Sequence, residues 1–103
     1  DRDFGQIAKL LWLRSGGRGR VIDALPHGWA VSDTYGVLRD LDKTDAFIRA
    51  VNARRDVSSA FLMTDDDGVF EAIVAGLPEG VEPVRLHDAY FRNFEIDAMR
   101  GVR

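Results

Sequence analysis

The sequence of 103 residues contains no cysteine and only two histidines. Without cysteine, the chain forms no disulfide and offers no thiolate to a metal ion. Its apolar runs are far shorter than the roughly 20 residues that a membrane-spanning helix requires, and the first residues do not show the basic-then-apolar pattern of a secretory leader. We therefore expect a cytoplasmic protein with no membrane partner. Because the sequence begins at Asp1 and not at Met, with a helical pattern already under way, we also expect an excised piece of a longer protein.

The chain also lacks an excess of positive charge, since its net charge is −3. The charge is uneven: residues 1–20 sum to +3, residues 21–84 to −7 and residues 85–103 to +1. A negative total does not favour a free-standing nucleic-acid binder. Any phosphate contact should therefore come from the two basic ends.

Residues 57–86 show the pattern of a β-α-β unit. Residues 57–63 form an apolar run long enough for a buried strand and too short for a buried helix. After an acidic turn, Val69, Phe70, Ile73, Val74 and Leu77 recur at the three- and four-residue spacing of one helix face. Residues 81–86 supply the next strand after a break at residues 78–80.

The preceding residues extend this pattern. Residues 34–38 are rich in β-formers, and the helix that follows should have Asp42 and Asp45 in a capping-box-like arrangement and end near Arg54 and Arg55. With right-handed crossovers, residues 34–86 predict a small parallel sheet covered by helices. We expect one α/β domain over residues 1–103, with a mostly parallel sheet of three to four strands and flanking helices.

The first part of the chain predicts a helix from Asp3 to Arg14, with Asp3 as its N-cap. Its inward stripe is Phe4, Ile7, Ala8, Leu10, Leu11 and Trp12. Residues 15–17, a serine and two glycines, should end it. Residues 21–22 fit either a short strand or an apolar anchor, and residues 29–31 fit a further short extended piece.

Asp65, Asp66 and Asp67 lie where α/β sheets usually bind ligands, beyond the carboxyl end of a strand. Three adjacent carboxylates suggest a Mg²⁺ site, because this ion prefers hard oxygen ligands. Consecutive side chains point in different directions, however. We therefore favour a capping role for one aspartate, with the others solvated near the positive end of the helix dipole.

Arg14, Arg18 and Arg20 belong to a flexible, glycine-rich basic loop that follows the first helix. Such a loop can contact phosphate, although strong phosphate loops lie at a helix N-terminus and have other glycine spacings. Alternatively, these arginines favour the helix C-terminus or pair with the acidic middle of the chain. The three arginines are the candidate DNA or phosphate contacts.

No catalytic site is indicated by the remaining polar residues. His27 and His87 are 60 residues apart with no third metal ligand of matching spacing, and no serine has a nucleophile-elbow pattern. Most aromatic side chains should be buried in the core. Near the C-terminus, Tyr90, Phe91, Arg92 and Phe94 form a candidate packing surface for another part of the protein.

Three stretches together resemble a known region: LLWLRSGGRGRVID, GWAVSDTYGVLRDLD and FLMTDDDGVFEAIVAGLPEGVEPVRLHDAYFRNFEI. They are similar to the C-terminal part of adenine-specific DNA methyltransferases of restriction–modification systems, the Mod subunits of type III-like systems. The similarity covers nearly the whole chain and rests on the overall pattern of residues. It implies a parent enzyme that transfers a methyl group from S-adenosylmethionine to a flipped adenine.

The motifs that carry this chemistry, Asp-Pro-Pro-Tyr and Phe-x-Gly-x-Gly, do not occur in the sequence. The resemblance therefore implies no catalytic, cofactor-binding or metal-binding residue in this chain, and S-adenosylmethionine is expected for the parent alone. The expected partner is the rest of the methyltransferase, and the restriction subunit, DNA and a second copy are further candidates. The leading interpretation is an excised, non-catalytic C-terminal accessory domain of such a methyltransferase, for subunit assembly or for partner or DNA contact. The alternatives are a DNA-contacting module that uses the Arg14–Arg20 loop and a Mg²⁺-dependent phosphotransfer domain that uses Asp65–Asp67.

Overall fold

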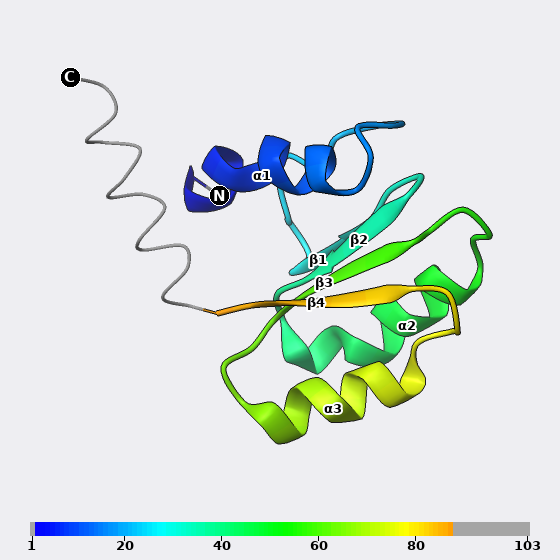
Figure 1. Cartoon of the computed structure of the whole chain (residues 1–103). Helices are drawn as coiled ribbons and strands as arrows, with labels where there is room; N and C mark the ends of the chain where they lie inside the picture. The colour runs from blue at the N-terminus through cyan, green and yellow to red at the C-terminus, as the bar shows by residue number, and fades with distance from the viewer. Residues whose placement is uncertain (1, 88–103) are drawn as a thin grey trace.

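The computed structural model of the chain describes residues 2–87. A long first helix is followed by alternating strands and helices (Figure 1). In chain order the elements are α1 (Arg2–Arg14), β1 (Trp29–Val31), β2 (Tyr35–Leu38), the short 3₁₀ helix η1 (Leu41–Lys43), α2 (Thr44–Asn52), β3 (Ser59–Met63), α3 (Asp67–Gly76) and β4 (Glu82–Leu86).

The strands form one sheet in the order β1-β2-β3-β4. β2, β3 and β4 are mutually parallel, and β1 pairs antiparallel with β2. Phe61 at the middle of β3 lies opposite Val37 of β2 and Val84 of β4. The prediction of an α/β fold with a small, mostly parallel sheet is confirmed, and residues 29–31 supply its antiparallel edge strand.

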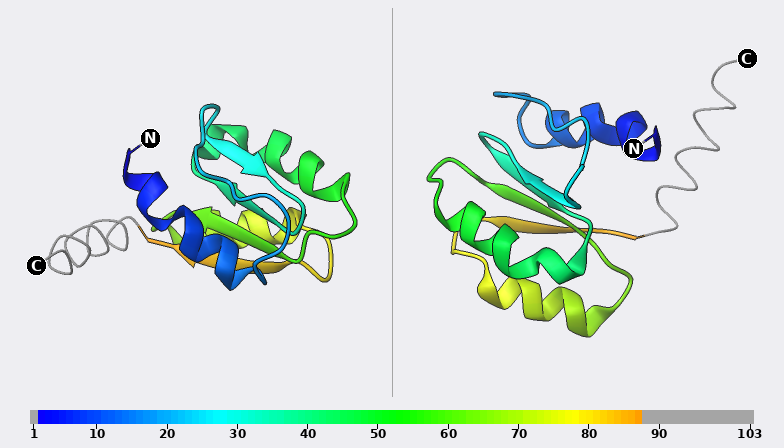
Figure 2. Two further views of the ribbon diagram at one scale, coloured as in Figure 1. Left: turned by 90° about the horizontal axis from the view of Figure 1, so that it is seen from above. Right: turned by 180° about the vertical axis from the view of Figure 1, so that it is seen from behind.

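Helices cover both faces of the sheet. α2 and α3 connect successive parallel strands and lie together on one face, as crossovers of one hand require, whereas α1 lies across the opposite face (Figures 1 and 2). Neighbouring residues of a strand point to opposite faces, so each strand contributes to two hydrophobic layers.

The layer beneath α1 contains Tyr35, Val37 and Phe61, none of them exposed to solvent. The layer beneath α2 and α3 contains Leu38 and Leu62, which are also fully buried. Burial on both faces explains why the central strands have continuous apolar runs instead of alternating patterns.

Ile22 resolves the two interpretations of residues 21–22, because this segment is an anchor and no strand is formed there. The Ile22 side chain is buried in the layer beneath α1. Its backbone N–H donates to the phenol oxygen of Tyr35 at 2.7 Å. The loop after α1 is thus fastened to β2 by one apolar and one polar contact.

Two predictions about the first helix are wrong. α1 begins at Arg2, so Asp3 lies within the helix and is not its N-cap. Leu10 is 43% exposed and does not belong to the inward stripe of Phe4, Ile7, Ala8 and Leu11. At 100° per residue, Leu10 lies about 110° around the helix from the centre of that stripe.

The predicted cap of the second helix is also wrong. A 3₁₀ turn precedes α2, and Asp40 caps this turn by accepting a hydrogen bond from the Asp42 N–H at 3.0 Å. α2 then starts at Thr44 with no side-chain cap, and it ends at Asn52, before Arg54. The extra turn moves the first unpaired N–H groups toward Asp40, so Asp42 and Asp45 serve as first-turn acids.

Candidate functional site

The loop after β3 contains the three consecutive aspartates, at the carboxyl edge of the sheet. Asp66 caps α3, since its Oδ1 accepts a hydrogen bond from the Val69 N–H at 2.9 Å. Asp67 Oδ1 lies 2.6 Å from Nη1 of Arg85. Asp65 Oδ1 lies 3.0 Å from Nδ1 of His87. The capping prediction is confirmed for Asp66, and the three carboxylates have three different partners.

Because the three aspartates have different partners, their carboxylates do not converge on one point, as the predicted Mg²⁺ site would require. Within residues 2–87, no group of three acidic or histidine side chains is placed to surround one metal ion. The guanidinium of Arg85 also lies 4.6 Å from the ring centre of Phe70, so it contacts an aromatic face as well as the Asp67 carboxylate. Capping and pairing thus account for the positions of the three aspartates.

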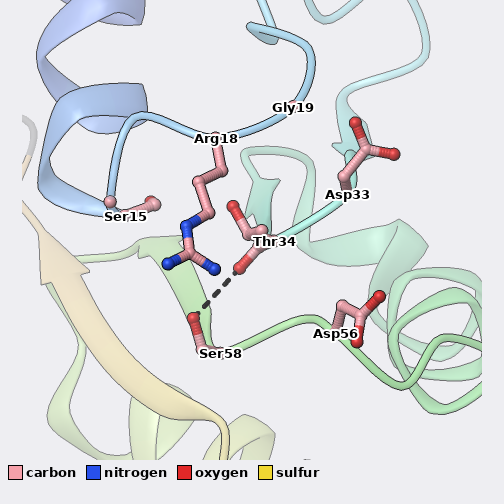
Figure 3. A pocket seen from close by; sticks show the side chains of 8 residues that line it. Ser15, Arg18, Gly19, Asp33, Thr34, Asp56 and Ser58 are labelled. Atoms are coloured by element: carbon pink, nitrogen blue, oxygen red, sulfur yellow. Dashed lines mark hydrogen bonds between the residues drawn. The ribbon is translucent and has the colours of Figure 1, made fainter.

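A cleft of about 670 Å³ opens at the other edge, where β2 and β3 begin (Figure 3). Three loops that are distant in sequence form its walls: the loop after α1, the β1–β2 turn and the connection from α2 to β3. The lining residues are Ser15, Gly16, Arg18, Gly19, Asp33, Thr34, Asp56 and Ser58. We call this feature the amino-edge cleft.

Hydrogen bonds fix the backbone of the loop after α1, which the sequence predicts to be flexible. The indole N–H of Trp12 donates to the carbonyl oxygens of Arg18 and Gly19 at 3.1 and 3.0 Å. The Arg20 N–H donates to Oδ2 of Asp33 at 2.9 Å, and the Ser32 hydroxyl donates to the Arg20 carbonyl at 2.6 Å. The prediction missed these contacts because two of the partners come from the β1–β2 turn.

Gly19 adds a steric reason for this loop conformation. Its φ of +71° lies in the left-handed region that favours glycine. A Cβ at this position would collide with the carboxylate of Asp33. The loop and the β1–β2 turn therefore approach one another as closely as glycine allows.

The three candidate arginines differ in their positions. Arg14 is exposed in the last turn of α1, and the Arg20 side chain is exposed beyond the loop. Arg18 extends from the loop into the amino-edge cleft, toward Thr34 and Ser58 (Figure 3). Among residues 2–87, the guanidinium of Arg18 has no hydrogen-bond or ion-pair partner. All three arginines are exposed, and of the three only Arg18 lines the cleft.

Hydroxyl groups form the floor of the cleft. The Ser58 hydroxyl donates to the Thr34 carbonyl oxygen over a long 3.3 Å, and the Ser15 hydroxyl donates to the Leu11 carbonyl oxygen at 2.8 Å. The hydroxyl oxygen of Thr34 is buried and has no partner in the described part of the chain. Buried polar atoms are rarely left in this state.

Two aspartates line the same cleft and differ in their surroundings. Asp33 accepts from the Arg20 N–H through Oδ2, and its Oδ1 lies 3.6 Å from Nη1 of Arg54. Asp56 is exposed, and no hydrogen bond or ion pair within residues 2–87 involves its carboxylate. The charge of Asp33 is therefore partly offset, whereas that of Asp56 is not.

Tyr35 connects the cleft to the core, because it begins β2 directly after Thr34. Burial raises the pKa of the Tyr35 phenol, and the nearby charge of Asp23 acts in the same direction. The hydrogen bond that the phenol oxygen accepts from the Ile22 N–H acts against this rise. Tyr35 therefore remains protonated at neutral pH and supports the loop through its oxygen.

The other candidates from the sequence have structural positions or lie outside the described residues. His27 is exposed in a turn. Trp29 packs edge-on against Phe47 with ring centres 6.4 Å apart, in agreement with a core role. The candidate packing surface, Tyr90, Phe91, Arg92 and Phe94, lies outside residues 2–87.

A comparison of the chain with protein-family models, curated proteins and solved structures finds no match. Within residues 2–87, no helix has the length and apolar character needed to cross a membrane.

Proposed function

We propose that this chain is a non-catalytic accessory domain of a DNA adenine methyltransferase of a restriction–modification system. The support for the enzyme class is the resemblance of three stretches, which fall on α1 and its loop, on β1–β2 and on β3–α3–β4. These stretches include residues of all four strands, of α1 and of α3, but none of α2. The resemblance thus involves several elements of the domain and not a single one.

Subunit assembly is the role that the surface of α1 supports best. Leu10 and Leu13 lie on the outer side of this helix and are 43% and 56% exposed. Val21, in the loop that follows, is 38% exposed. A residue spacing of three places Leu10 and Leu13 on neighbouring positions of one helix face. Exposed apolar side chains grouped in this way are typical of a protein–protein contact.

Substitution of Leu10 and Leu13 by polar residues tests the assembly role. The double substitution Leu10→Ser and Leu13→Ser should weaken self-association or association with the rest of the methyltransferase, as measured by light scattering. The melting temperature should change little, because both side chains are largely outside the core. Ala24→Ser, at an exposed position away from α1, is the control. A wild-type chain that stays monomeric and does not associate with the rest of the enzyme would exclude assembly.

The enzyme class has a separate test. The proposal predicts that a methyltransferase containing residues 1–103 retains S-adenosylmethionine binding when these residues are deleted. Its subunit assembly or DNA methylation should decline. Loss of cofactor binding on deletion would show that the domain contributes to the catalytic core.

A second candidate role is DNA contact through the Arg14–Arg20 loop. The observation that favours it is the fixed backbone of this loop, with Arg14 and Arg20 exposed and Arg18 in the cleft. DNA binding by such arginines should fall steeply with salt, because neutralised phosphates release counterions. Binding that does not depend on salt would contradict this role.

A further inference from the structure

The amino-edge cleft combines one unpaired cation with hydroxyl groups at the base of the parallel strands. We propose that it binds a single phosphate group of a DNA backbone, with the Arg18 guanidinium as the main contact and the hydroxyls of Thr34 and Ser58 as neutral partners. This inference rests on the proposed function only for the source of the phosphate. The site itself is argued from the residues that line the cleft.

Arg18 has the chemistry and the position for this contact. A guanidinium is always charged and presents a planar set of N–H donors that matches two phosphate oxygens. In the described part of the chain, none of these donors is used by another residue, although the side chain extends between the walls of the cleft (Figure 3). Arg14 and Arg20 do not line the cleft. The proposal therefore separates Arg18 from the other two arginines.

Thr34 provides an independent indication of a ligand. Its hydroxyl oxygen is buried and unpartnered, while its carbonyl oxygen accepts from both the N–H and the hydroxyl of Ser58, at 2.8 and 3.3 Å. Thr34 lines the cleft, so rotation of its side chain would bring the buried hydroxyl to a phosphate oxygen, which would accept a hydrogen bond from it. The Ser58 hydroxyl makes only a long bond, so it is able to turn toward the same ligand.

The backbone that presents Arg18 is already ordered for binding. Trp12 fixes the carbonyl groups of Arg18 and Gly19, and Asp33 fixes the N–H of Arg20. On the preceding side, the Gly17 N–H donates to the Trp12 carbonyl oxygen at 3.0 Å, so the residues on both sides of Arg18 are restrained before any ligand arrives. A restrained loop loses less conformational entropy on binding than a flexible one.

The acidic residues of the cleft limit how many phosphates it accepts. The Asp33 carboxylate is engaged by the Arg20 N–H and by Arg54. Asp56, on the side of the cleft away from Arg18, has no such partner in residues 2–87 (Figure 3). Its charge repels any phosphate on that side of the cleft, so a bound phosphate should lie on the Arg18 side. The geometry therefore fits one phosphate contact and not a continuous basic track.

The test measures the binding of a short labelled DNA duplex to the whole chain by fluorescence anisotropy at several salt concentrations. Arg18→Ala should weaken binding by about tenfold, the effect of a charge-assisted hydrogen-bond pair. It should also reduce the salt slope by about 1, as for the loss of one phosphate contact. Lys43→Ala removes the same charge from the opposite edge of the sheet and should have a much smaller effect.

Thr34→Val distinguishes the cleft from general attraction by basic residues. Valine matches the shape of threonine without the hydroxyl group, so the variant should fold as well as the wild type and bind DNA several-fold more weakly. Equal losses of DNA affinity in the Arg18→Ala and Lys43→Ala variants would overturn the proposal. So would full binding by a correctly folded Thr34→Val variant.

Competition by inorganic phosphate and by a mononucleotide identifies the source of the phosphate. Weak competition with preserved dependence on Arg18 supports a DNA backbone contact. If the mononucleotide binds through Arg18 and the duplex does not bind, the cleft is a phosphate site but the DNA assignment is overturned. A methyltransferase that needs residues 1–103 for methylation but is unaffected by Arg18→Ala would overturn the cleft and leave the proposed function intact.

Discussion

At the carboxyl edge of the sheet each of the three consecutive aspartates has a partner, whereas at the amino edge the guanidinium of Arg18 and the hydroxyl of Thr34 have none among residues 2–87. The carboxyl edge is where parallel α/β sheets usually bind ligands. In this domain its three aspartates serve as a helix cap, as an ion-pair partner of Arg85 and as a contact of His87, and the cleft lies at the opposite edge. An acidic cluster is therefore a weaker indication of a site than a polar group that lacks a partner.

The difference between the edges has a local cause. α3 begins directly after β3, so its free N–H groups require a cap from residues that follow the strand. At the amino edge, the loop after α1 is held through its backbone: Trp12 of α1 binds the carbonyl oxygens of Arg18 and Gly19, and the β1–β2 turn binds the N–H and carbonyl groups of Arg20. The side chain of Arg18 is left available because its backbone provides the structural contact.

Both edges belong to one sheet, and Phe61→Ala should destabilise this sheet more than the other substitutions below. Phe61 is fully buried at the centre of β3 and packs edge-on against Tyr35 with ring centres 6.0 Å apart. We expect a loss of about 3–5 kcal/mol in the free energy of unfolding, measured by urea denaturation. Phe70→Ala, at a partly buried ring that the sequence places in the core, should have a smaller effect. If Phe61→Ala and Phe70→Ala lowered the free energy of unfolding equally, the full burial of Phe61 and the partial burial of Phe70 would be contradicted.

A substitution at Gly19 should disturb only the amino edge of the sheet. Gly19→Ala should lower the free energy of unfolding by about 1–3 kcal/mol through its left-handed backbone, and further through the collision with Asp33. Gly80 is a matched control, because its φ is +90° but a Cβ there would have no neighbour within 4 Å. If Gly80→Ala is as damaging as Gly19→Ala in thermal melts, the close approach to Asp33 does not constrain the loop.

Tyr35→Phe measures how strongly the loop is fastened to β2. The change leaves the Ile22 N–H unpaired in a buried place and should lower the free energy of unfolding by about 1–3 kcal/mol near neutral pH. The raised pKa of Tyr35 also has a pH signature. The folded protein retains the phenol proton above pH 10.0, where an unfolded chain loses it, so this contribution to stability falls as the pH rises beyond that value. The Tyr35→Phe variant should have a weaker alkaline decline in urea melts at a series of pH values.

The smallest effects concern the aspartates and test whether their roles differ. Asp66→Ala removes the cap of α3 and should lower the free energy of unfolding by about 0.5–2 kcal/mol. Asp65→Ala breaks an exposed contact with His87 and should have a smaller effect of about 0–1 kcal/mol. Calorimetry with Mg²⁺ provides a second measurement. Tight binding that Asp65→Ala, Asp66→Ala and Asp67→Ala each abolish would contradict the structural role of these residues.

Much of the fold is predictable from local sequence patterns. The three parallel strands, the helices between them and a cap by one of the three aspartates follow from the spacing of apolar residues and from turn chemistry within a few positions. The same local rules place Asp42 as a cap and Leu10 in the core, and both predictions are wrong. A 3₁₀ turn before α2 accounts for the first error, and the limited width of the face that α1 buries accounts for the second.

The candidate site depends on contacts that no local pattern contains. Three hydrogen bonds join residues that are far apart in the sequence. The separation is 18 residues for Asp67 and Arg85, 13 for Arg20 and Asp33, and 24 for Ser58 and Thr34. These pairs come together only when the crossovers bring the ends of the strands to common edges. Local spacing specifies which residues are helical, extended or buried, because those preferences act within a turn or a strand. Which polar groups find partners, and which remain free to bind a ligand, is settled by the packing of distant segments.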